Sequence, residues 1–173
     1  MDYRQTLDFL YSQLPMYQRI GAAAYKTDLN NTIEICTMLG NPEKRFRSIH
    51  IAGTNGKGSV AHLLASVIQE SGYKTGLYTS PHLTDFRERI RINGKMIPKN
   101  AVTSFIEKHA DMVDHIKPSF FEYTFGMAME YFAEKGVDIA LVETGMGGRL
   151  DSTNVINPIL SVINNIGMDH TRF

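Results

Sequence analysis

The sequence predicts an α/β domain with a mostly parallel sheet flanked by helices, and three observations support this fold class. From residue 48 onward, short apolar runs alternate with longer segments of helical periodicity, which is the pattern of βαβ units. A glycine-rich turn that contains a lysine stands between the first apolar run and the first of these helices. The chain has 173 residues, 43% of them hydrophobic, which is the usual size of one domain and enough to build its core.

A short helical segment, residues 1–47, is expected to precede this core. Apolar residues at spacings of three and four predict a helix over 3–14, which Pro15 ends. We predict a second helix with Asp28 as its N-cap and an end at Gly40. Its buried side is expected to contain Leu29, Ile33, Cys36 and either Met38 or Leu39. No cationic residue stands next to Cys36, so it is expected to be a small buried apolar residue rather than a reactive thiol.

The α/β core, residues 48–173, contains four predicted strands at 49–52, 75–79, 139–143 and 159–163. A helix with one buried stripe is predicted between the first two strands, from the spacing of Val60, Leu63, Leu64, Val67 and Ile68. Residues 89–97, with Asn93 and Gly94 at the centre, predict a small hairpin. Two further helices are predicted, one from Pro98 to about 115 and one over 120–135. The second should bury Phe121, Phe125, Met129 and Phe132.

Composition and charge narrow the classes of function. Eighteen basic residues balance eighteen acidic ones, which argues against a protein that coats nucleic acid. A single cysteine allows no internal disulfide, and this favours a reducing, cytoplasmic location. No stretch approaches the roughly 18 apolar residues of a membrane span, and the N-terminus lacks the apolar centre of a signal peptide. We therefore expect neither a nucleic-acid partner nor a membrane partner.

The strongest local signal is IHIAGTNGKGS, residues 49–59, in which a strand, a glycine-rich turn with a lysine and the start of a helix follow one another. Glycines allow the backbone to wrap closely with its N–H groups turned inward, and the helix N-terminus adds its positive dipole end. Lys57 adds a full charge suited to β- and γ-phosphates. The common pattern GxxxxGK(S/T) is not matched, because Gly58 stands where the hydroxyl residue would be and Ser59 comes one place later. The predicted ligand is a polyphosphate, bound by residues Gly53, Thr54, Asn55, Gly56, Lys57, Gly58 and Ser59.

Three more polar residues follow predicted strands. Glu143 ends the strand at 139–143, Ser80 follows the strand at 75–79, and His170 comes after the strand at 159–163. Ligands of open α/β sheets bind at the carboxyl ends of the strands, and an acidic residue there commonly holds the magnesium of a nucleotide site. Each residue alone has an ordinary explanation as a surface carboxylate, a turn serine or a hydrogen-bonded histidine. Their common placement favours one shared site.

At this point the motifs GTNGKGS, YTSPHL, VETGMGGRLDSTN and GMDH, in this order and spacing, resemble the N-terminal domain of the dihydrofolate synthase/folylpolyglutamate synthase family, within the Mur-ligase superfamily. The resemblance spans most of residues 28–170. It implies a P-loop NTPase-like central domain of the Mur-ligase type. It also implies a reaction in which ATP phosphorylates a pterin-linked carboxylate and the amine of L-glutamate attacks the acyl phosphate to form an amide.

The resemblance also implies residue roles. Gly56, Lys57, Gly58 and Ser59 match phosphate contacts, and Lys57 and His170 become the candidate catalytic residues. Two Mg²⁺ sites are implied, the first with Ser80 and Glu143 and the second with His170. The implied pterin contacts are Asp28, Leu29, Asn30, Phe121, Glu122, Thr124, Leu150, Asp151 and Ser152. The implied partners are ATP, dihydropteroate or a tetrahydrofolate polyglutamate, and L-glutamate, acting on a monomeric parent protein.

Members of this family are more than twice as long as the present chain. We therefore expect residues 1–173 to be a truncated ATP-binding domain without the C-terminal glutamate-binding domain, and inactive in ligation by itself. Two alternatives remain open from the sequence, a P-loop kinase and a nucleotide-binding module without chemistry. ATP turnover that depends on a pteroate would separate the three.

Overall fold

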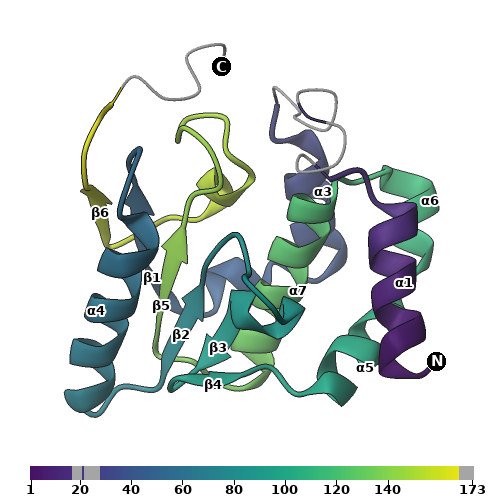
Figure 1. Ribbon diagram of the computed structural model, residues 1–173, viewed down its shortest axis with the longest axis horizontal. Helices are drawn as coiled ribbons and strands as arrows, with labels where there is room; N and C mark the ends of the chain where they lie inside the picture. Colours follow the sequence, from purple (N-terminus) through teal and green to yellow (C-terminus); the bar gives the residue numbers. More distant parts are fainter. Residues whose placement is uncertain (17–20, 22–27, 168–173) are drawn as a thin grey trace.

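The computed structural model describes residues 1–16, 21 and 28–167, and in it a central sheet has helices on both faces (Figure 1). The sheet has six strands in the order β4-β3-β2-β5-β1-β6. The strands are β1 (Arg47–Ala52), β2 (Thr75–Tyr78), β3 (Ile90–Ile92), β4 (Lys95–Met96), β5 (Ile139–Glu143) and β6 (Leu160–Ile163). The helices are α1 (Tyr3–Gln13), α3 (Asn30–Met38), α4 (Lys57–Glu70), α5 (Lys99–His109), α6 (Asp111–Ile116) and α7 (Phe120–Glu134), with short 3₁₀ helices η2 (Pro42–Lys44), η3 (Phe86–Arg89) and η4 (Ser152–Val155).

The strands that matter for function are parallel and adjacent. Strand β5 pairs in parallel with β1 on one side and with β2 on the other, and β1 also pairs in parallel with β6. Strands β3 and β4 extend the sheet beyond β2 in antiparallel pairing. The carboxyl ends of β2, β5, β1 and β6 therefore share one edge of the sheet, where ligands of open α/β sheets bind.

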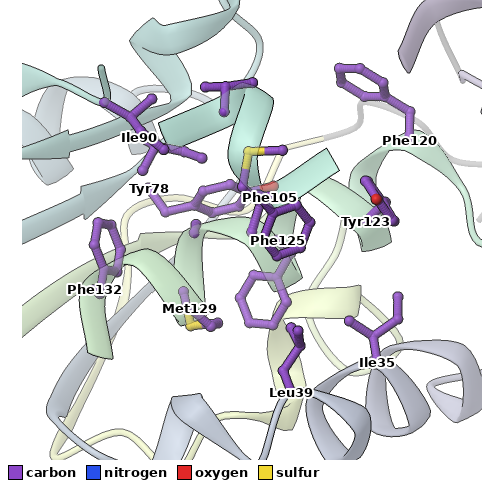
Figure 2. Close-up of a cluster of buried hydrophobic side chains, with 14 of the residues drawn as sticks. Ile35, Leu39, Tyr78, Ile90, Phe105, Phe120, Tyr123, Phe125, Met129 and Phe132 are labelled. Atoms are coloured by element: carbon purple, nitrogen blue, oxygen red, sulfur yellow. The ribbon is translucent and has the colours of Figure 1, made fainter. Parts of the chain in front are cut away.

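Each face of the sheet has its own hydrophobic cluster. Of the helices in the described residues, α4 is the one that covers this first face (Figure 1), where Ala61 packs with Ile49, Ile51, Leu77, Ile139 and Leu141. The larger cluster lies on the other face, between the sheet and the remaining helices, and α7 is buried along most of its length. Figure 2 shows aromatic residues of α7 in this cluster between residues of α3, α5 and the sheet. These two clusters hold the central strands in place under the site.

The predicted fold class is confirmed, and so are the predicted strands and the hairpin, within one or two residues at their ends. The helix predicted from 98 to 115 is instead divided at Ala110 into α5 and α6. Burial was predicted less well than secondary structure. Three apolar residues predicted to be buried are exposed, namely Ile33 (51%), Leu63 (70%) and Val67 (63%), whereas of the two alternatives Met38 and Leu39 it is Leu39 that is buried.

The burial errors have a common cause. Helices α3 and α4 each carry apolar residues around more than half of their circumference, so spacing alone cannot tell which stripe faces the sheet. In α3 the buried residues are Thr32, Ile35 and Cys36. Cys36 is indeed buried, as predicted, and burial together with the nearby Glu43 carboxylate raises the pKa of its thiol to about 12.

Candidate functional site

The turn between β1 and α4, Gly53–Ser59, is hereafter the phosphate loop. Gly53 has φ of +133° and Gly56, the N-cap of α4, has φ of +78°, a region of backbone geometry that favours glycine. A Cβ atom at Gly56 would lie 2.6 Å from Asn164 Nδ2, so a side chain there would displace the Asn164 amide. The bonds of α4 begin with Val60 N–H donating to Gly56 O. The amides of the first helical turn are therefore available to an anion.

Lys57 lies across the phosphate loop. Its Nζ donates to Gly53 O at 2.8 Å and to Thr54 O at 3.3 Å. The ammonium group is thus held by two backbone carbonyl groups of the phosphate loop, and it lies at the N-terminus of α4. A phosphate placed there would meet both the positive charge and the helix dipole.

A segment that the sequence did not single out supports the phosphate loop from behind. Asn165 accepts from Thr54 N through its backbone oxygen (2.9 Å) and from Asn55 N through Oδ1 (2.8 Å). Asn164 Nδ2 donates to Asn55 O, and Gly167 N donates to Thr54 Oγ1. Asparagines just after β6 were the only signal for this role, and they are common in turns of every kind. Because two loop amides are already bonded here, the first turn of α4 is the part best placed to bind phosphate.

Glu143 ends β5 beside this loop and is 4% exposed. Its Oε2 accepts from Ser80 N at 2.9 Å, which ties the end of β5 to the turn after β2. Burial raises the pKa of the Glu143 carboxyl, and the Ser80 N–H, Lys57 and Arg89 oppose that rise. A Cβ atom at Gly58 would be 3.6 Å from Glu143 Oε1, so the carboxylate lies against the first turn of α4. The structure therefore brings Lys57, Ser80 and Glu143 together, as the sequence predicted.

The donor atoms at this point fit a hard cation. A buried carboxylate and a nearby serine hydroxyl are oxygen ligands, the kind that Mg²⁺ prefers. Within the described part of the chain, no group of three or more His, Cys, Asp or Glu side chains could form a metal cage. This is compatible with Mg²⁺, which is usually bound by one or two protein oxygens together with water and phosphate. His170, predicted for a second metal, lies outside the described residues.

A second surface of the site forms around Gly145, which follows β5. A Cβ atom at Gly145 would lie 2.9 Å from Phe121 Cζ and 3.1 Å from Asp151 Oδ2, so two predicted pterin contacts meet here. Phe121 also lies 5.8 Å from the Tyr78 ring, centroid to centroid. Leu150 and Ser152, next to Asp151, are half-buried. Gly145, at the centre of this surface, is separated from the metal candidate Glu143 by a single residue, Thr144.

Of the other predicted pterin contacts, Glu122, Thr124 and Asp28 have hydrogen-bond partners within the chain. Glu122 is 1% exposed, and its Oε2 accepts from Ser119 N at 2.6 Å in the capping box of α7. Thr124 is fully buried, and its Oγ1 donates to Phe121 O. Asn31 Nδ2 donates to Glu122 Oε2, which brings the start of α3 to the start of α7. Asp28, Leu29 and Asn30 directly precede Asn31, and Asp28 Oδ1 accepts from Asn30 N.

Two residues near the site were missed by the sequence reasoning. Arg89 is 4% exposed, and its Nε donates to His82 Nδ1 at 2.7 Å. The guanidinium carbon lies 5.1 Å from the centre of the Phe120 ring, and burial lowers the pKa of Arg89. His82 belongs to the motif YTSPHL, and Arg89 is the first residue of the hairpin predicted at 89–97. In the charged string DFRERIRI, a single buried arginine leaves no distinct sequence signal.

Comparison with known proteins agrees with this geometry. The profile described as the Mur ligase middle domain matches residues 51–173. A dihydrofolate synthase/folylpolyglutamate synthase of Bacillus subtilis is 43% identical over 152 residues, which are 84% of this chain and 35% of the relative. Among solved structures, a folylpolyglutamate synthase of Thermotoga maritima superposes with a TM-score of 0.86 at 40% identity, over 97% of this chain and 39% of that one.

A folylpolyglutamate synthase in complex with AMPPCP and folate superposes with a TM-score of 0.90 at 35% identity, over all of this chain and 42% of that one. The chain thus spans roughly two fifths of the length of these relatives. The matched profile includes the phosphate loop, Ser80, Glu143 and the surface around Gly145. The chain therefore belongs to the Mur ligase family, in the branch of the folylpolyglutamate and dihydrofolate synthases.

Proposed function

We propose that this chain is the nucleotide-binding domain of an ATP-dependent ligase that adds L-glutamate to dihydropteroate, to (poly)glutamylated tetrahydrofolate, or to both. One observation carries the proposal. Glu143 lies against both the phosphate loop and Ser80, and the Phe121–Asp151 surface lies around Gly145, two residues further along the chain. A triphosphate and a flat aromatic acid would then meet at the same strand end. The AMPPCP–folate complex of the similar folylpolyglutamate synthase supports this pairing of ligands.

The proposed reaction has two steps. An oxygen of the substrate carboxylate attacks the γ-phosphorus of ATP, and ADP leaves with the electron pair of the broken P–O bond. The amine of glutamate then attacks the acyl carbon, loses a proton, and expels inorganic phosphate as the amide forms. Lys57 and the first-turn amides of α4 would hold the phosphates in line, because such transfers depend on positioning and charge neutralisation.

Glu143 and Ser80 are the residues proposed to hold Mg²⁺, which when bound would neutralise charge on the phosphates. A second Mg²⁺, held by His170, is also part of the proposal. The Phe121–Asp151 surface, with Asp28–Asn30, Glu122, Thr124, Leu150 and Ser152, is proposed to bind the pterin. Within the described part of the chain, no helix is long and apolar enough to cross a membrane. We propose a cytoplasmic, monomeric parent enzyme.

The test is ADP release by the full-length protein, measured with dihydropteroate or tetrahydrofolate in the presence and absence of L-glutamate. We expect turnover that requires both the pteroate and glutamate, with a glutamylated product visible by mass spectrometry. A phosphorylated product without any need for glutamate would favour a kinase. Nucleotide binding without turnover would favour a module without chemistry.

A further inference from the structure

A buried histidine is hydrogen-bonded to the proposed pterin-binding segment. His50 is the fourth residue of β1 and is 7% exposed, and its side chain lies on the face opposite the α4 cluster. His50 Nε2 lies 2.7 Å from Oγ1 of Thr153, which is fully buried in η4. The loop after β5 rises above the sheet and returns through η4 towards β6 (Figure 1), so this contact joins two distant parts of the chain.

The direction of each hydrogen bond can be assigned. Thr153 Oγ1 donates to Asp151 Oδ1 at 2.5 Å, and Thr153 N donates to the same oxygen at 3.0 Å. A hydroxyl has one hydrogen, and the Thr153 hydroxyl uses it in the hydrogen bond that it donates to the Asp151 carboxylate. The Thr153 oxygen must therefore accept from His50, which requires the tautomer with hydrogen on Nε2. Burial lowers the pKa of His50, which favours this neutral form.

Asp151 in turn holds the loop that covers the strand end. It is 3% exposed, and its Oδ2 accepts from Met146 N at 2.8 Å. The same oxygen lies against Gly145, where the Phe121 ring also packs. Any rotation of this carboxylate would release the Met146 amide and shift the wall that Phe121 and Asp151 form. The orientation of Asp151 therefore decides the shape of the proposed pterin-binding surface.

We infer that His50 is a positioning residue for the substrate: through the Thr153 hydroxyl it fixes Asp151, and with it the segment 145–152. The inference rests on the proposed function. It adds that β1 contributes to the binding of both ATP and the pterin substrate. The backbone of β1 continues into the phosphate loop, whereas the His50 side chain fixes the loop that faces the pterin. Losing the His50 bond should therefore affect the pteroate and leave ATP binding unchanged.

Matched variants test this division in the ligase assay. His50→Leu and Thr153→Val each break the relay, and we expect the KM for dihydropteroate to rise roughly 3- to 10-fold, the effect of one buried hydrogen bond. The KM for ATP should stay within about twofold. His50→Gln places an amide N–H near the position of Nε2, and Thr153→Ser keeps the hydroxyl, so both should restore the wild-type KM. The double variant should be no worse than either single one.

Ile49→Val is the matched control, because it removes a methylene from the opposite face of the same strand and so weakens the packing of β1 without touching His50. It should leave both KM values unchanged. The inference is overturned if Ile49→Val reproduces the effect, if the KM for ATP rises equally, or if His50→Gln fails to restore the KM. Any of these results would make His50 a general stabiliser of β1.

A second measurement does not depend on the proposed reaction. Hydrogen exchange at the Met146 amide reports directly whether Asp151 holds the loop. His50→Leu should speed exchange at Met146 and leave Val60, inside α4, unchanged. Unchanged exchange at Met146 would refute the relay itself. Changed exchange without any pteroate-dependent turnover in the wild type would instead uphold the relay and refute the proposed function.

Discussion

Lys57 and Glu143 are the two charged side chains on which the candidate site depends, and they lie in different environments. The ammonium group of Lys57 is hydrogen-bonded to two loop carbonyl groups and is half-buried. The carboxyl of Glu143 is buried at the end of β5 with one backbone donor, and its pKa is raised. These environments favour Lys57 as the cation that contacts the phosphates. They favour Glu143 as a metal ligand, because a bound cation would stabilise the charged form of its buried carboxyl.

For Lys57 we predict a loss of nucleotide affinity. Lys57→Ala should weaken binding of a non-hydrolysable ATP analogue by about 1–3 kcal/mol, because a charge-assisted hydrogen bond to phosphate is lost. Isothermal titration of the wild type and the variant measures this difference. Lys108→Ala, which removes an exposed lysine paired with Glu130, should bind as the wild type does. Equal affinities for all three proteins would remove the phosphate-loop assignment.

For Glu143 we predict opposite effects on activity and stability. Glu143→Gln keeps an oxygen for the Ser80 amide but removes the charge, so activity should fall about 10- to 100-fold. Because the folded state raises the pKa above 4.5, ionisation at neutral pH costs stability in the wild type alone. The variant should therefore melt at the higher temperature at pH 7, and the difference should vanish below about pH 4.5. Retained activity at limiting Mg²⁺, or a lower melting temperature at pH 7, would contradict the assignment.

At the scale of an element, the turn between β2 and β3 is fixed by Glu88. Its carboxylate accepts from the backbone N–H groups of Leu83, Thr84 and Asp85 and from the Thr84 hydroxyl. These donors lower the pKa of Glu88 from 4.5 to about 2. The turn begins with Ser80 and ends with Arg89, whose Nε donates back to His82 Nδ1. Its order is therefore coupled to the position of a proposed metal ligand.

We predict that the Glu88→Ala variant loosens this turn without unfolding the sheet. Hydrogen exchange at Leu83, Thr84 and Asp85 should become faster, while exchange in β5 stays slow. In the wild type the same loosening should appear as pH falls from about 4.5 towards 2, because a carboxyl with a lowered pKa loses its stabilising effect there. Glu134→Ala, on the exposed end of α7, is the control. Protected amides in the Glu88 variant would show that other contacts order the turn.

At this scale, the sequence predicted well what local chemistry determines. The phosphate loop follows from its glycines and lysine, and the strands follow from their apolar runs. The helix predicted over 98–115 was divided, because no glycine or proline marks the break at Ala110. The supports of the site, Asn164, Asn165 and the Arg89–His82 contact, could not be predicted. The asparagine contacts depend on which strands become neighbours, because residues more than 100 positions apart meet at Asn55, whereas the Arg89–His82 contact depends on how the turn between β2 and β3 folds.

At the scale of the whole molecule, β6 is one of the two edge strands of the sheet in the described part of the chain, the other being β4. Strand β6 pairs with β1 alone, and Leu160 and Ile163 are more than half exposed. The exposed Leu63 and Val67 of α4 add apolar area elsewhere on the surface. An unprotected edge strand with apolar side chains tends to pair with another chain. The 173-residue polypeptide is therefore prone to self-association.

We predict that this polypeptide forms dimers or larger species as its concentration rises, which light scattering after gel filtration would detect. Ile163→Lys should shift the population towards the monomer, because a charge on an edge strand opposes pairing. Leu83→Lys is the control, since Leu83 is 89% exposed but lies on the turn after β2. A wild-type polypeptide that stays monomeric at all concentrations would show that the edge is already protected.

The position of β5 between β1 and β2 has a consequence for synthesis on the ribosome. These two strands do not pair with each other, and each meets the sheet centre only through β5. A nascent chain makes β2, which ends at Tyr78, and must then add roughly 60 residues before β5 begins at Ile139, which takes about 3–12 s at ordinary rates of translation. During that interval the strand that leads into the phosphate loop lacks its central partner. Chaperones that bind emerging apolar strands are therefore expected to engage this protein before its middle strand has left the ribosome.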